Sequence, residues 1–142
     1  MNITPVNKRN FSQAVQVYRA SWQESHKDIC SPEFVKNRDC AAYLWKRRNG
    51  LYLLTDGEPA GVIRIHNGLL STLYIHPDKQ GRGYGRILLN FALQMDPNLK
   101  LTVLSTNERA AGMYLRHGFR YTGRQQLLRE GLWEREMIRS AV

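Results

Sequence analysis

The pattern of apolar and polar residues predicts a strand and two helices in the first third of the chain. Residues 2–6, NITPV, have the composition of a short strand, and Asn10 suits the N-cap of a helix that follows it. Apolar side chains recur at helical spacing after that cap: Phe11, Ala14, Val15, Tyr18 and Trp22. A second helix is expected to begin at Ser31, before a proline, and to continue until Gly50 stops it.

Strand patterns dominate the middle of the chain. Residues 51–55, 60–66 and 69–77 are predicted strands, and the segments DGEP and NG between them are hairpin signals, so an antiparallel meander is expected. The remainder predicts a helix, a strand, a helix and a hairpin that turns near REG, in that order: residues 87–93, 99–105, 107–118 and 119–140.

This order of elements predicts the α+β class, with helices flanking one mixed, mostly antiparallel twisted sheet. A chain of 142 residues, 42% hydrophobic and 23% charged, fits one domain over residues 1–142. No apolar run approaches the roughly 18 residues of a membrane span, and the start lacks the design of a secretion signal, so we expect a cytoplasmic protein without a membrane partner. Cys30 and Cys40 are too far apart for a metal pair, so free thiols and no metal are expected.

The net charge of +9 points to an anionic partner or a basic surface. Nucleic acid, membrane and a phosphorylated small molecule are the three classes of partner that this charge suits. A nucleic-acid-binding protein would gather basic residues and aromatic residues on one face. Here the basic residues are scattered from Lys8 to Arg139, with only KRR at 46–48 contiguous, so nucleic acid is the less favoured partner.

A glycine-rich stretch at residues 76–94, HPDKQGRGYGRILLNFALQ, lies between an expected strand and an expected helix. The free amides and positive dipole end of a helix start bind anions, and glycines let a diphosphate approach the backbone. A Walker loop would place a lysine after Gly85, and a Rossmann fingerprint would place a glycine three residues after Gly83. Arg86 occupies both positions, so neither nucleotide motif is present.

The stretch resembles the acetyl-coenzyme A loop of the GCN5-related N-acetyltransferases (GNAT family), whose pattern is Gln or Arg, two residues, Gly, one residue, Gly or Ala. Gln80, Gly83 and Gly85 match each fixed position. A later segment, NERAAGMYLRHGF, also resembles the family pattern at six positions: Asn107, Ala110, Ala111, Tyr114, Gly118 and Phe119. The resemblance covers nearly the whole chain and implies a GNAT-like domain in which two strands splay apart to form the acetyl-CoA cleft.

The resemblance also implies cofactor contacts. The pantetheine arm of acetyl-CoA is expected against the strand backbone at Leu73, Tyr74 and Ile75. Backbone amides of the loop are expected to hold the pyrophosphate, those of Gln80, Gly81, Arg82, Gly83, Tyr84 and Gly85. The side chain of Tyr84 is expected only to pack at the helix start. Asn107 has two open roles, as an N-cap and as a contact of the pantetheine arm.

Acetyl transfer to an amine requires a proton acceptor, a donor for the oxyanion and an acid for the leaving thiolate. By resemblance, Tyr114 is the candidate acid, and a backbone N–H near Ile75 is the candidate oxyanion donor. Many family members carry a glutamate where this chain has Leu69 or Leu70, so the usual base is absent. His66, Glu24 and His26 remain as candidate bases.

The acceptor amine is expected between the first two helices and the terminal hairpin. These segments hold aromatic and acidic side chains: Trp22, Glu24, His26, Asp28, Glu33 and Trp133. Such a lining suits a small cationic amine or a peptide amine. The sequence therefore favours an N-acetyltransferase whose partners are acetyl-CoA and a primary amine, and a homodimer is one open state of assembly. A catalytically silent acyl-CoA sensor remains an alternative, because fold does not fix function.

Overall fold

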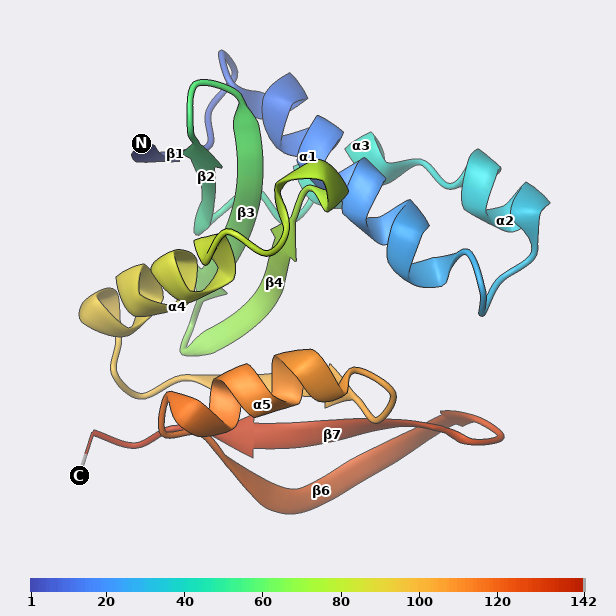
Figure 1. Cartoon of the computed structure of the whole chain (residues 1–142), viewed down its shortest axis with the longest axis vertical. Helices are drawn as coiled ribbons and strands as arrows, with labels where there is room; N and C mark the ends of the chain where they lie inside the picture. Colours follow the sequence, from blue (N-terminus) through green and yellow to red (C-terminus); the bar gives the residue numbers. More distant parts are fainter. Residues whose placement is uncertain (142) are drawn as a thin grey trace.

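A computed structural model describes residues 1–141, and seven strands form one sheet in this part of the chain (Figure 1). The strands are β1 (Asn2–Pro5), β2 (Leu51–Thr55), β3 (Pro59–His66), β4 (Leu69–Ile75), β5 (Lys100–Leu104), β6 (Arg120–Arg129) and β7 (Leu132–Ile138). The helices are α1 (Phe11–His26), α2 (Pro32–Asn37), α3 (Cys40–Trp45), α4 (Tyr84–Met95) and α5 (Glu108–Arg116), with a 3-10 turn η1 (Pro77–Lys79). Val142, the last residue of the expected domain, lies outside the described residues.

The sheet has the order β1-β2-β3-β4-β5-β7-β6 and consists of two antiparallel halves. Strands β2 to β4 form the predicted meander, β1 pairs antiparallel with β2, and β7 pairs antiparallel with both β5 and β6. Across the junction, β4 and β5 are parallel and share one residue pair, Leu69 with Lys100. The mixed, mostly antiparallel sheet and the splayed strand pair are confirmed.

Two hydrophobic cores cover the two faces of the sheet. Helices α1 and α3 bury one core against β2 and β3, while α4 and α5, on the near face in Figure 1, bury the other. The second core spans both halves of the sheet, since Leu88 of α4, Ile63 of β3, Tyr114 of α5 and Met137 of β7 belong to it. It therefore holds the halves together where the strands do not pair. No helix within residues 1–141 has the length and apolarity to span a membrane.

The expected second helix is two helices, which corrects the prediction of one. Ser31 caps α2 as predicted, since its Oγ accepts the Phe34 amide at 3.2 Å. The backbone then turns extended at Arg38, and Asp39 caps α3 by accepting the Ala42 amide at 2.9 Å. An aspartate inside a helical pattern is also a strong N-cap, and here that second role prevails.

Asn10 corrects a second detail. Helix α1 begins at Phe11 as predicted, but the Asn10 side chain makes no capping bond to it. Its Oδ1 accepts the amide of Asn7 at 2.7 Å, and its Nδ2 donates to the carbonyl of Pro5 at 3.0 Å. Asn10 therefore fixes the loop between β1 and α1. Cys30 and Cys40 are free thiols, as expected.

Candidate active site

The opening between β4 and β5 exposes one edge of the β4 backbone. The His76 amide donates to the carbonyl of Ala60 on β3 at 2.8 Å, and the direction of backbone groups alternates along a strand. The backbone of Tyr74 therefore also faces β3, whereas Leu73 and Ile75 face the opening. Of the three strand residues expected at the cofactor, only Leu73 and Ile75 keep backbone groups available.

A β-bulge in β4 shapes this edge, and sequence reasoning missed it. The register with β3 shifts between Arg64 and Ile65, which leaves Ser71 as the extra residue of β4. As a result, Leu70 and Leu73 both pack against the α4–α5 core although their spacing is odd. Bulges re-aim side chains and often border active sites. The alternation of apolar residues in LLSTLYI carries no signal of where the extra residue falls.

The glycine loop presents free amides at the start of α4. Gly83 is the N-cap residue in the left-handed region, with φ of 81°, and Gly81 has φ of 80°. The first amide with a helical acceptor is that of Ile87, which donates to the Gly83 carbonyl at 3.1 Å. The amides of the first three helical residues, Tyr84 to Arg86, consequently have no acceptor within the helix. This arrangement is an anion site of the expected kind.

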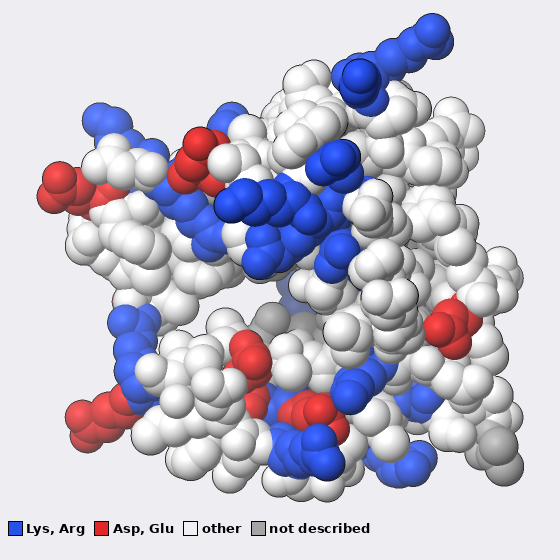
Figure 2. Space-filling view, turned by 180° about the vertical axis from the view of Figure 1, so that it is seen from behind, with Lys and Arg blue, Asp and Glu red and all other residues white. Residues whose placement is uncertain are grey.

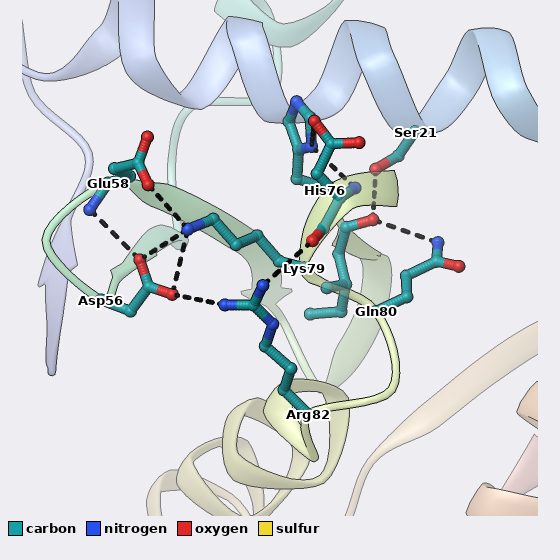
Figure 3. A network of polar contacts seen from close by, with 9 residues as sticks. Ser21, Asp56, Glu58, His76, Lys79, Gln80 and Arg82 are labelled. Atoms are coloured by element: carbon teal, nitrogen blue, oxygen red, sulfur yellow. Dashed lines mark hydrogen bonds and ion pairs between the residues drawn. The ribbon is translucent and has the colours of Figure 1, made fainter.

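Asp56 anchors the glycine loop through side chains that the sequence did not single out (Figure 3). The Tyr84 hydroxyl donates to its carboxylate at 2.8 Å, Lys79 Nζ lies 3.2 Å from it, and Arg82 Nη1 lies 3.7 Å away. Lys79 also pairs with Glu58 at 2.9 Å. The Tyr84 hydrogen bond is the main cause that lowers the pKa of Asp56 from 3.8 to about 2, followed by those from Lys79. The segment DGEP was read only as a hairpin turn, yet it supplies both carboxylates.

This network occupies the side chains of Lys79, Arg82 and Tyr84. The prediction that the Tyr84 side chain only packs at the helix start is corrected, because its hydroxyl also bonds Asp56, so only its backbone amide remains for a ligand. Lys79 and Arg82 already have carboxylate partners, so the anion donors that remain at the loop are its backbone amides and the Arg86 side chain, which lies beside Gly83. Gln80 ties the glycine loop to β4, because its Nε2 donates to the Ile75 carbonyl at 3.4 Å.

Helix α1 also reaches the open end of β4. Ser21 Oγ donates to the same Ile75 carbonyl at 2.7 Å, and Figure 3 shows Ser21 and Gln80 meeting there from opposite sides. The Ile75 carbonyl is therefore occupied, while the Ile75 amide on the opening is the free group. Three elements, α1, β4 and the glycine loop, are joined at this carbonyl.

Tyr114 combines a buried ring with an accessible hydroxyl. Its side chain is 7% exposed, and the ring meets Phe119 edge-on at 5.6 Å. No hydrogen bond to the hydroxyl is present, and residues 1–141 contain no fully buried polar side-chain atom without a partner. The hydroxyl therefore keeps a small solvent-exposed surface. Burial, and secondarily Tyr74, raises the pKa of Tyr114, so the group is a protonated donor at neutral pH.

Asn107 takes the first of its two expected roles. Its Oδ1 accepts the Ala110 amide at 3.2 Å and so caps α5. That bond uses the side-chain oxygen and leaves the amide nitrogen Nδ2 for another contact. The role at a pantetheine arm stays a prediction.

The two leucines at the position expected for the usual glutamate differ in exposure: Leu69 is 43% exposed and Leu70 is buried. Two of the candidate bases are poorly placed. Glu24 is paired with Lys27 at 2.9 Å on the surface. His66 pairs with Leu69 in the β3–β4 register, at the closed end where β4 and β5 still meet.

His26 is the candidate base whose geometry leaves a lone pair free. Its Nδ1 lies 2.8 Å from the carbonyl of Trp22, an acceptor, so Nδ1 carries the proton and Nε2 is unprotonated in the neutral ring. The ring stacks on Trp22 with centroids 4.2 Å apart. Burial lowers the pKa of His26 from 6.5, and the nearby charges of Arg38 and Arg129 lower it further. His26 is therefore neutral at pH 7.

The terminal hairpin meets the α1–α2 loop, as expected of the acceptor side. Arg129, at the hairpin tip, donates to the carbonyl of Ile29. Trp133 is half-buried in β7, where its amide donates to Ser105 Oγ at 3.0 Å. Trp22 is 3% exposed, so it belongs to the core instead of forming an open aromatic wall.

With this geometry in place, comparison with known proteins decides the family. A family model described as an acetyltransferase (GNAT) domain matches residues 12–140. The chain belongs to the GNAT acetyltransferase family. The resemblance drawn from Gln80, Gly83 and Gly85 is confirmed.

Individual GNAT relatives agree with this assignment. The peptidyl-lysine N-acetyltransferase YjaB of Escherichia coli (strain K12) is 39% identical over 70 residues, 49% of this chain and 48% of YjaB. The match thus spans about half the length of that curated relative. The solution structure of apo-form YjaB from Escherichia coli has a TM-score of 0.75 at 24% identity, covering 99% of this chain and 98% of YjaB.

A structure solved with coenzyme A shares the GNAT fold as well. PaiA N-acetyltransferase from Thermoplasma acidophilum, in complex with coenzyme A, has a TM-score of 0.72 at 18% identity and covers 95% of this chain and 96% of its own. At this identity the likeness establishes the fold.

Proposed function

We propose that this protein is a single-domain N-acetyltransferase that transfers the acetyl group of acetyl-CoA directly to a primary amine. The observation that carries the proposal is the junction of the glycine loop with the open edge of β4. Free amides suited to a pyrophosphate lie there beside free strand groups suited to an extended arm. Membership of the GNAT family supports the same reaction.

Acetyl-CoA is held mainly by the backbone in this proposal. The amides from Gly81 to Gly85 and at the start of α4 bind the pyrophosphate, and the backbone groups of Leu73 bind the pantetheine arm, which leaves the Ile75 amide for the thioester end. Asn107 Nδ2 contributes one further donor. The Asp56 network holds the loop in shape before acetyl-CoA arrives, which reduces the ordering that binding must accomplish.

The chemistry follows from the groups left free. The amine nitrogen attacks the thioester carbonyl carbon and forms the N–C bond, while the Ile75 N–H stabilises the oxyanion. The C–S bond then breaks. His26 Nε2 accepts the amine proton, directly or through water, and the Tyr114 hydroxyl donates a hydrogen bond to the leaving thiolate. A free thiol titrates near roughly 8.5 and a phenol near roughly 10, so complete proton transfer from Tyr114 is not required.

The acceptor in this proposal is the side-chain amine of a lysine in a peptide. The support comes from relatives such as YjaB and YiaC, both named peptidyl-lysine N-acetyltransferases. A small-molecule amine is the competing acceptor. A cytoplasmic location is retained from the sequence as part of the proposal, and a homodimer stays one open state of assembly.

A second candidate function rests on the leucines at the usual glutamate position. A chain that binds acetyl-CoA without a competent base would be an acyl-CoA sensor. Incubation of acetyl-CoA with lysine peptides, amino acids and small amines, followed by thiol release and product mass, separates the two functions. The enzyme proposal expects amine-dependent thiol release with an acetylated product. Tight acetyl-CoA binding with thiol release at the hydrolysis rate across the panel would replace it with the sensor.

A further inference from the structure

Arg38 occupies an aromatic cage beside the candidate base. Its guanidinium carbon lies 4.3 Å from the ring centroid of Trp22 and 4.4 Å from that of Tyr43. Its Nη2 donates to the Tyr18 hydroxyl at 3.0 Å. Trp22 also stacks with His26, so the arginine and the histidine share one aromatic neighbour.

The cage holds the arginine without neutralising it. None of the ion pairs within residues 1–141 includes Arg38. Arg38 borders a hollow of about 370 Å³ that is also lined by Ser31, Glu33, Phe34 and Asn37. The carboxylate of Glu33 is not within ion-pair distance of Arg38. The half-buried guanidinium thus carries an unpaired positive charge.

The ring contacts leave most of the hydrogen-bonding edge of this guanidinium free. Aromatic rings contact the flat faces of an arginine, whereas its five N–H donors lie in the plane. One of these donors is used by Tyr18, the only hydrogen-bond partner of the Arg38 side chain among the described residues. An arginine already held by its faces loses less freedom when a planar anion binds its edge.

The cage lies on the acceptor side of the open strand pair. Ser21, the residue before Trp22, donates to the carbonyl of Ile75 at 2.7 Å, and the ring of Tyr18 meets that of Tyr74 at 5.4 Å. The cage is therefore built on the part of α1 that covers the end of β4. Figure 2 shows a cleft between the upper and lower parts of the molecule, with Lys and Arg side chains gathered above it.

We propose that Arg38 binds a carboxylate of the acceptor, so that the preferred acceptor carries a carboxylate close to its reactive amine. This inference rests on the proposed N-acetyltransferase function. A planar carboxylate matches the free edge of a guanidinium, and the unpaired charge favours an anion over a neutral amide. The carboxylate has two sources: an Asp or Glu beside the target lysine of a peptide, or the α-carboxylate of a free amino acid.

The test compares acceptors that differ only in charge. Lysine peptides with Glu or Gln beside the lysine, and a free amino acid against its amide, are assayed for kcat/KM with acetyl-CoA. We expect wild type to prefer the carboxylate of a pair by about ten- to hundredfold, the range of a hydrogen bond to a charged group. The pair that shows the preference identifies the source.

Two variants separate recognition from structure. Arg38→Gln should reduce the rate on the acidic acceptor to that on the amide and leave acetyl-CoA affinity unchanged. Arg47→Gln is the matched control, because Arg47 is also half-buried and stacks on Tyr43, at 3.7 Å, without bordering the hollow. It should keep the full preference.

The possible failures are distinguishable. Wild-type rates within about threefold for every pair, or a preference that survives Arg38→Gln, would overturn the inference while leaving the acetyltransferase intact, since single neutral contacts account for such factors. No acetylation of any acceptor by wild type would instead overturn the proposed function. The wild-type comparison needs no variant, so it decides even if Arg38→Gln does not fold.

Discussion

Replacing Tyr114 with phenylalanine isolates the hydroxyl that the proposed reaction uses. The ring stays in the core against Phe119, and the hydroxyl makes no hydrogen bond within residues 1–141. The free energy of unfolding should therefore change by less than about 1 kcal/mol, the worth of one neutral hydrogen bond. A donor to the developing thiolate is worth far more, about a hundredfold to ten-thousandfold in the chemical step.

The assay must observe that step. Rapid mixing of the enzyme–acetyl-CoA complex with amine, followed by thiol release in the first turnover, avoids masking by slow product release. Acetyl-CoA affinity should remain within about twofold to threefold of wild type, because the contact strengthens only as charge develops on sulfur. Burial raises the pKa of Tyr114, so its donor function should persist across the neutral and mildly alkaline range.

Tyr52→Phe is the matched control. Tyr52 packs edge-on against Phe91 with centroids 4.9 Å apart, the same kind of pair as Tyr114 with Phe119, but on the β1–β4 half of the sheet away from α5. The Tyr52→Phe variant should show the first-turnover rate of wild type. If the first-turnover rate of Tyr114→Phe were within about threefold of that of Tyr52→Phe, the reasoning would be refuted and Tyr114 would be a packing residue.

Three further predictions address the loop, its anchor and the base. Gly83→Val should weaken coenzyme A binding at least tenfold by calorimetry, because its side chain would enter the diphosphate's approach. Gly68→Val, at a similar positive φ in the β3–β4 turn, should cost comparable stability but no affinity, and equal affinity losses would contradict the assignment. Asp56→Asn should lower the Tm at neutral pH. The pKa of Asp56 falls from 3.8 to about 2 on folding, so the ionised carboxylate stabilises the fold above about pH 4 and this stabilisation vanishes as pH falls through 2. The difference in Tm between wild type and Asp56→Asn should therefore disappear near pH 2. An advantage that persists at pH 2 would exclude Asp56 as its source. His26→Gln should slow the chemical step about a hundredfold or more. It should also remove the acidic limb of the pH–rate profile, whose pKa in wild type lies below 6.5. His117→Gln is its control, because His117 Nδ1 makes the same bond to a carbonyl one turn earlier, at 2.8 Å, and a wild-type pH profile in His26→Gln would eliminate His26 as the base.

Local signals in the sequence were sufficient for much of the fold. The glycines and Gln80 identified the loop, turn residues separated the strands, and Ser31 marked the start of α2 where its side chain caps the helix. These features depend on neighbours within a few residues. The splayed pair came from family resemblance, and the single contact of Leu69 with Lys100 confirms it.

Features that depend on distant neighbours were missed. The helix break at Arg38 is accompanied by a cage of rings from α1 and α3, which no local pattern indicates. The role of Asp56 depends on Lys79 and Tyr84, more than twenty residues away in sequence. Which backbone groups of β4 face the opening follows from strand register, so Tyr74 could not be separated from Leu73 in advance.

The most direct test follows both products of one reaction. Acetyl-CoA and a lysine peptide are incubated with the wild-type protein, and free thiol, acetylated peptide and acetylated protein are quantified by mass at successive times. The account predicts equal amounts of thiol and acetyl-lysine from the first turnover, with no acetyl group on the protein. An acetylated protein that forms before the peptide product would contradict direct transfer, and thiol without acetyl-lysine would contradict the acetyltransferase itself.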